Sequence, residues 1–163
     1  MKLNRLIKMI AATVPLGTIA AVALMIPLAA QQGRNGQIHI VKDCDGESLM
    51  PGTDFCTITI SNLPELPMGT QIYYDLSPGP VAGPGYFDQN IFVFVNENQW
   101  AVGRCTGPNN INTPGPVGLC TITDGIGPLA GFSARINVTY RSGGSGSLFA
   151  WDGTYSFNPL PGR

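Results

Sequence analysis

The sequence has a single histidine, His39, and few basic residues beyond its first ten positions. After position 30 there are six lysine and arginine residues against ten acidic ones, a net charge of about −4, with no basic run. This balance argues against nucleic acid or an anionic lipid surface as a partner. No G-x-S-x-G motif is present, and His39 lacks the partners of a Ser-His-Asp triad. We expect His39 to be an ordinary surface or barrel-wall residue.

Metal sites have little support. The chain has no C-x-x-C pair, so a zinc site would lack ligands. Asp43, Asp45 and Glu47 lie close together, but the segment is too short for an EF-hand loop, and a solvated acidic loop is the simpler interpretation. We expect no metal, and no cofactor is indicated.

Residues 1–30 have the order of a secretory signal peptide. Lys2, Arg5 and Lys8 precede the apolar, uncharged residues 9–30, and polar residues follow Ala30. The alternative is a retained membrane anchor formed by residues 9–30, since 22 apolar residues are enough to span a bilayer. Both interpretations place residues 31–163, a single domain, outside the cytoplasm: secreted, periplasmic or at the cell surface.

All four cysteines lie in residues 31–163. An even number of cysteines in an exported domain favours disulfides. Four cysteines allow three connectivities, and we favour Cys44–Cys56 and Cys105–Cys120, because each pair would close a connection between neighbouring strands. Each loop would add on the order of 3 kcal/mol to stability by restricting the unfolded chain.

Residues 31–163 contain no amphipathic helix of useful length, and their apolar residues instead alternate with polar ones, as in strands. The clearest signal is a long hairpin whose arms, Phe132–Arg141 and Leu148–Phe157, flank a Gly/Ser loop. Six further strands are predicted before it: Gln37–Asp43, Phe55–Ser61, Gln71–Leu76, Asn90–Val95, Gln99–Arg104 and Val117–Thr123. The Pro/Gly-rich segment 77–85 is the strongest break, and such a loop could cap an opening or decorate an edge.

Eight short strands with short connections predict an all-β, antiparallel domain. A closed barrel and a two-sheet sandwich both fit this pattern. The barrel is the fold that we predict, because closure removes the exposed edge strands that a sandwich must protect.

The segment Asp124–Phe132 resembles the G-x-G-x-[FL]-x-G turn of the allene oxide cyclase and dirigent β-barrels. The segments around Cys105 and Cys120 also resemble paired segments of bacterial secreted relatives of that barrel. Glycines at positions 125, 127 and 131 would allow backbone conformations and close approaches that a Cβ atom blocks. The resemblance implies an eight-stranded barrel with an internal apolar cavity that associates as a homo-oligomer. Plant members bind or steer a reactive intermediate, but the catalytic residues of the family do not map onto this chain.

The aromatic side chains could form a filled core or line a cavity. For the wall of a cavity, the candidate ligand-binding residues are Tyr74, Trp100, Arg104, Trp151 and Tyr155, in which polar groups would orient a ligand within apolar surroundings. The leading hypothesis is an exported barrel that binds a small apolar molecule, with a cyclase-like role left open. The alternatives are a non-catalytic structural domain of the cell surface with a filled interior, and an exported cyclase that steers a reactive chain.

Overall fold

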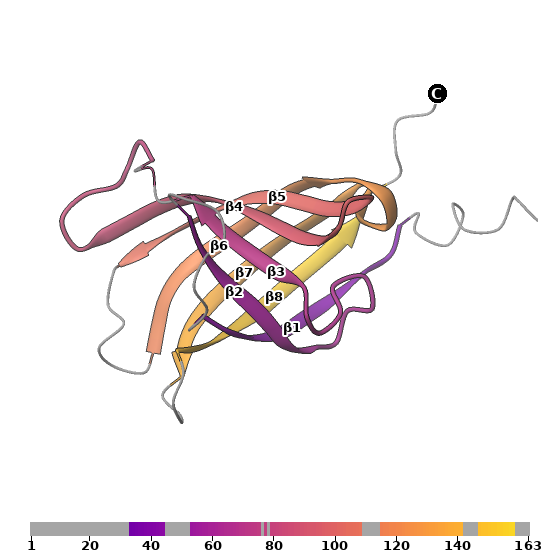
Figure 1. Cartoon of the computed structure of the whole chain (residues 1–163), viewed down its shortest axis with the longest axis horizontal. Coiled ribbons are helices and arrows are strands. Elements are labelled where there is room, and N and C mark those ends of the chain that lie inside the picture. The colour runs from indigo at the N-terminus through magenta and orange to yellow at the C-terminus, as the bar shows by residue number, and fades with distance from the viewer. Residues whose placement is uncertain are drawn as a thin grey trace, which may run out of the picture.

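The computed structural model describes residues 33–44, 53–75, 77, 79–108, 115–141 and 147–158. These residues form strands and one short 3-10 helix (Figure 1). The elements are β1 (Asn35–Asp43), β2 (Thr53–Ser61), β3 (Gln71–Asp75), β4 (Tyr86–Asn96), β5 (Gln99–Pro108), β6 (Gly115–Gly125), η1 (Gly127–Leu129), β7 (Phe132–Arg141) and β8 (Leu148–Phe157).

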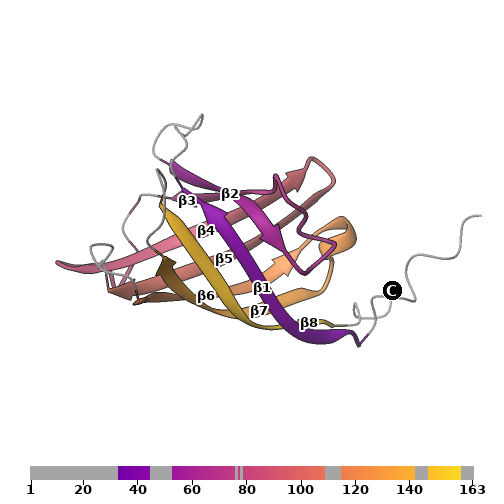
Figure 2. The same cartoon turned by 90° about the horizontal axis from the view of Figure 1, so that it is seen from below.

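The strands form one closed antiparallel barrel, in which each strand pairs with the next and β8 pairs with β1. The closing pair runs from Asn35 opposite Ser156 to Asp43 opposite Leu148, and Figure 2 shows β1 lying beside β8. This long seam confirms the predicted eight-stranded antiparallel barrel and excludes the sandwich. All eight predicted strands are present, and the largest differences are in β4, which begins four residues earlier than predicted, and β5, which ends four residues later.

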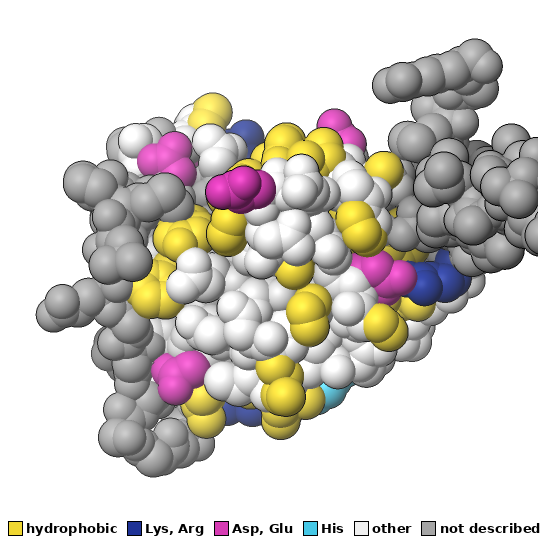
Figure 3. All heavy atoms as spheres, turned by 45° about the vertical axis from the view of Figure 1, so that its right-hand side comes forward, with side chains coloured by type: hydrophobic (Ala, Val, Ile, Leu, Met, Phe, Trp, Pro, Cys, Tyr) yellow, Lys and Arg dark blue, Asp and Glu magenta, His cyan; other side chains and the backbone are white. Residues whose placement is uncertain are grey.

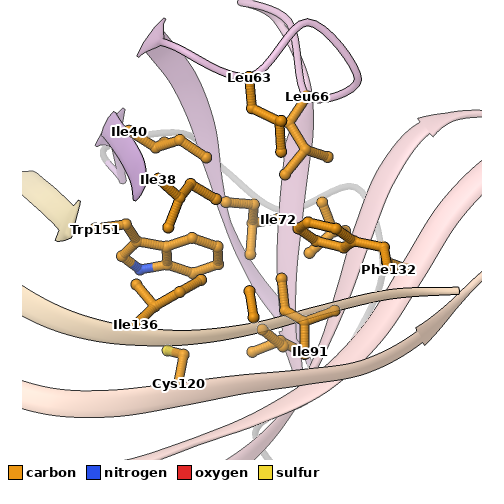
Figure 4. Packing of buried hydrophobic residues seen from close by; sticks show 14 of the residues in the cluster. Ile38, Ile40, Leu63, Leu66, Ile72, Ile91, Cys120, Phe132, Ile136 and Trp151 are labelled. Carbon is orange, nitrogen blue, oxygen red and sulfur yellow. The ribbon is translucent and has the colours of Figure 1, made fainter. Parts of the chain in front are cut away.

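The core is the inner face of the barrel, which alternate residues of each strand reach. Figure 4 shows Trp151 with Ile38 and Ile136 on either side of its indole ring. One end of the barrel is filled by buried leucines from the connections between strands, Leu63, Leu66 and Leu129. We call these three residues the leucine plug. Because they come from the connections β2–β3 and β6–β7, they close the end at which β1 and β7 begin.

The glycines of the predicted turn have the roles that the motif indicates. Gly127 and Gly131 have φ angles of 61° and 74°, which L side chains rarely adopt. A Cβ atom on Gly127 would lie 2.0 Å from the Asn98 carbonyl oxygen. The turn therefore packs directly on the neighbouring backbone and delivers Leu129 to the plug.

Both predicted disulfides are present, Cys44–Cys56 and Cys105–Cys120. The first joins the end of β1 to β2, and the second joins residues that are directly opposite each other on β5 and β6. The predicted signal peptide or anchor, residues 1–30, lies outside the described residues. No helix among the described residues has the length and apolar character that a membrane span requires.

Candidate functional site

The barrel is hollow at the end opposite the leucine plug. A pocket of about 430 Å³ opens there, and all eight strands contribute to its lining. Its walls are mostly apolar and include the sulfur atoms of both disulfides. Its lining includes Lys42, Tyr74, Phe87, Val138 and Phe149. We call this space the open-end pocket.

Lys42 is a buried basic residue of this pocket, whose lining also includes the carboxylate Asp54. It shares the inward face of β1 with Ile38 and Ile40, and only 3% of it is exposed. The register of β1 against β2 shifts directly after Val41, and the Thr59 hydroxyl donates to the Val41 carbonyl there at 3.2 Å. The extra residue of this β-bulge is Thr59 on β2, beside the point where Lys42 enters the barrel.

The Lys42 amine is surrounded by rings and sulfur. Its Nζ atom donates to the Tyr74 hydroxyl oxygen at 2.7 Å and lies 3.3 Å from Cys56 Sγ. The ring centroids of Tyr74 and Phe149 are each 4.8 Å away, and the Trp151 ring is 5.3 Å away. The ion pairs among the described residues are Arg34–Glu65, His39–Asp152 and Arg104–Asp88. None of them includes Lys42.

Burial changes the acid–base properties of this pair. Loss of hydration disfavours the charged ammonium, which lowers the pKa of Lys42 from 10.5 to about 7. The same burial raises the pKa of the Tyr74 hydroxyl well above its usual range, so that it stays protonated. At neutral pH the pocket therefore contains a partly neutral amine next to a hydroxyl that can donate a proton.

The candidate ligand-binding residues lie in three different places. Tyr74 lines the open-end pocket, and Trp151, fully buried, faces the Lys42 amine. Tyr155 lies further toward the plug, where its ring packs 6.2 Å from Phe132. The Trp151 indole N–H has no hydrogen-bond partner in the described part of the chain.

Trp100 and Arg104 lie on the outer wall of β5. Ala101 directly follows Trp100, and Cys105 directly follows Arg104; both are buried and point inward, and successive side chains of a strand point to opposite faces. The Trp100 ring is 5.5 Å from Phe92, on the neighbouring β4. The structure thus brings Tyr74 and Trp151 together around Lys42 and places Trp100 and Arg104 on the opposite side of the wall.

Arg104 pairs with Asp88, a carboxylate that is almost fully buried. The guanidinium binds both carboxylate oxygens and lowers the pKa of Asp88, whose second oxygen also accepts the Val81 N–H at 2.9 Å. The described part of the Pro/Gly-rich segment is thereby held against β4, on the outside of the barrel. Arg104 has a structural partner, and this pair fixes a loop.

The outer wall of β3 to β6 carries a shallow groove of about 880 Å³. It is larger than the open-end pocket and lies on the outside of the barrel, where its lining includes Tyr73, Asn90, Val102, Arg104 and Thr121. Figure 3 shows one face of the molecule, on which hydrophobic side chains are interspersed with uncharged polar ones and charged groups are few. No set of three or more metal-ligating side chains lies together in the described ranges.

Sequence reasoning did not single out Lys42. The signal was available, because Lys42 follows Ile38 and Ile40 at a spacing of two residues in the predicted strand Gln37–Asp43, and the only other lysines are Lys2 and Lys8. A lone lysine in register with buried isoleucines is unusual, since lysine is almost never fully buried.

Comparisons with known proteins assign no family to the chain. No protein-family model matches it, and no curated protein matches it. A solved structure of a pterocarpan synthase dirigent protein is similar, with a TM-score of 0.36 and 9% sequence identity over 86% of this chain and 98% of that chain. A TM-score this low carries no argument about fold or function, and the barrel rests on its own strand pairing.

Proposed function

We propose that the protein binds a small, largely apolar molecule in the open-end pocket. The observation that carries this proposal is a partly hollow interior in which aromatic and aliphatic side chains surround Lys42 and Tyr74, two polar groups in contact with each other. Two further polar residues, Asp54 and Gln89, also line the pocket. A volume of about 430 Å³ falls in the range of small-molecule sites, which typically combine apolar walls with a few placed polar groups.

We propose further that the domain works outside the cytoplasm, since disulfides persist in oxidising compartments. The glycine turn supports a relation to the allene oxide cyclase and dirigent barrels, and a cyclase-like role would be the steering of a reactive ligand by the shape of the pocket. The alternative function is that of a structural domain that binds no ligand. A binding experiment distinguishes the two functions.

The binding test uses N-phenyl-1-naphthylamine, a neutral apolar fluorophore, titrated into the full chain. Val138→Phe would fill the open-end pocket, and Val102→Phe would fill the outer groove instead. We expect Val138→Phe to weaken binding at least about tenfold and Val102→Phe to leave it unchanged, with circular dichroism confirming that both variants fold. Native mass spectrometry of protein from its own source would then show whether a ligand co-purifies.

Loss of binding in the Val102→Phe variant alone would move the site to the outer wall. Absence of fluorophore binding in the wild type, together with no co-purifying ligand, would support the structural domain.

A further inference from the structure

Lys42 has the surroundings of a reactive amine. The side chain is buried within the open-end pocket, its described neighbours offer no carboxylate in salt-bridge distance, and its Nζ atom lies 2.7 Å from the Tyr74 hydroxyl. Among the described residues the amine has no ionic partner, and a buried ammonium in such surroundings is costly, so a residue that served packing alone would be better replaced by an apolar one. The position of Lys42 in the pocket therefore calls for a chemical role.

We propose that Lys42 binds an apolar aldehyde covalently, as an imine, with the alkyl or aryl part of the aldehyde in the open-end pocket. This inference rests on the proposed ligand-binding function and names the chemical class of the ligand. The Phe149 and Trp151 rings, which flank the amine, would contact the apolar part.

The chemistry is complete with the groups at hand. The neutral Lys42 amine adds to the carbonyl carbon: a C–N bond forms, the C–O π bond breaks, and one proton moves from nitrogen to oxygen to give a carbinolamine. The nitrogen then loses its second proton as the C–N double bond forms, the C–O bond breaks, and the departing hydroxyl takes up a proton and leaves as water. Tyr74 can donate the proton that the departing oxygen needs and recover it from the nitrogen.

The lowered pKa of Lys42, about 7, supports this chemistry, because an ordinary lysine with a pKa near 10.4 is almost entirely protonated at neutral pH and attacks a carbonyl only slowly. Tyr74 stays protonated, and its hydroxyl lies 2.7 Å from the Lys42 Nζ atom, close enough to relay a proton. A ligand carboxylate is the competing occupant, since it could pair with the ammonium form of the same side chain.

The test treats the full chain with hexanal and sodium cyanoborohydride at pH 7 and locates the alkylated amines by peptide mass spectrometry. We expect Lys42 to be labelled at least about tenfold faster than in the same chain unfolded in urea with its disulfides reduced, and the labelling rate to be half-maximal near pH 7. Lys42→Met and Lys42→Arg should give no adduct at position 42. Tyr74→Phe should slow labelling, with circular dichroism confirming that this variant folds.

Two outcomes would overturn the inference while sparing the proposed function: fluorophore binding with no hexanal adduct at Lys42, or labelling of Lys42 at the same rate in the folded and unfolded chains. Lys42-dependent binding of hexanoate without an aldehyde adduct would also overturn it and identify a carboxylate site instead. Failure of both fluorophore and hexanal to bind would remove the proposed function together with the inference.

Discussion

The Lys42 side chain makes the stability of the barrel depend on pH. Its pKa is 10.5 in the unfolded chain and about 7 in the folded one. Above pH 10.5 both states are neutral and the residue contributes no pH dependence. As the pH falls from 10.5 to 7, the unfolded chain binds a proton that the folded chain does not, so the free energy of unfolding decreases. Below about pH 7 both states are protonated and the decrease ends.

Lys42→Met should therefore stabilise the protein at pH 7, by at most on the order of 5 kcal/mol, and the gain should shrink as the pH approaches 10. Methionine keeps the length of the apolar stem and removes the amine. Urea denaturation between pH 6 and 10 measures the difference. The exposed Arg141→Met variant is the control for loss of a positive charge, and stability curves of wild type and Lys42→Met that run parallel at every pH would contradict the prediction.

Side-chain direction decided which candidate residues could be placed from the sequence. Alternation along β1, β3 and β8 correctly separates inner from outer faces, and it would have put Lys42 inside with Ile38 and Ile40. The same rule separates Trp100 and Arg104 from the interior, because Ala101 and Cys105 are buried. Aromatic and basic residue types alone do not carry this information, since strands of a barrel place such side chains on both faces.

Strand β8 depends on a glycine near its middle. Gly153 pairs with Ile38 on β1 and Ile136 on β7, and a Cβ atom there would lie 2.0 Å from the Arg135 carbonyl oxygen. The contact is with backbone, which cannot move aside without breaking the ladder. The close approach of β7 and β8 therefore requires that position 153 carry no side chain.

We predict that Gly153→Ala lowers the free energy of unfolding by about 1–3 kcal/mol or more, as overpacking of a core does. Gly83→Ala is the matched control, because a Cβ atom on Gly83 would meet no atom within 4 Å. That variant should change stability by less than about 0.5 kcal/mol. Thermal melts followed by circular dichroism compare the two, and equal melting temperatures would show that β7 and β8 can separate at this point without cost.

The boundaries of the strands were less predictable than their existence. The N-terminal part of β4 contains the polar residues Asp88 and Gln89, which lie outside the predicted strand Asn90–Val95. Asp88 is nevertheless buried, because Arg104 on β5 binds its carboxylate. A pair that forms only across two strands leaves no local signal in either, so tertiary contacts set the boundary here.

At the scale of the whole molecule, the seam between β1 and β8 is what separates a barrel from a sandwich. The pair joins residues more than a hundred positions apart, from Asn35 opposite Ser156 onward. Alternation and turn residues describe only local structure, and the sequence therefore left both folds open. The two disulfides do not cross this seam, since one joins β1 to β2 and the other β5 to β6, so non-covalent pairing and the shared core hold it closed.

This arrangement predicts how the barrel responds to loss of a disulfide. The pairs close short loops, with sequence separations of 12 and 15 residues, so removing either one should cost about 3 kcal/mol of stability by releasing the unfolded chain. A domain of this size is typically stable by about 5–15 kcal/mol. The variant Cys105→Ala/Cys120→Ala should thus remain a folded barrel at 25 °C and unfold at a lower urea concentration, whereas reduction of both disulfides should bring the protein close to its unfolding threshold.

Urea titrations of the variant, and of the wild type with and without a reductant, measure the two steps. Complete loss of sheet structure in the single-disulfide variant would show that the covalent link, and not the β1–β8 seam, holds the barrel together.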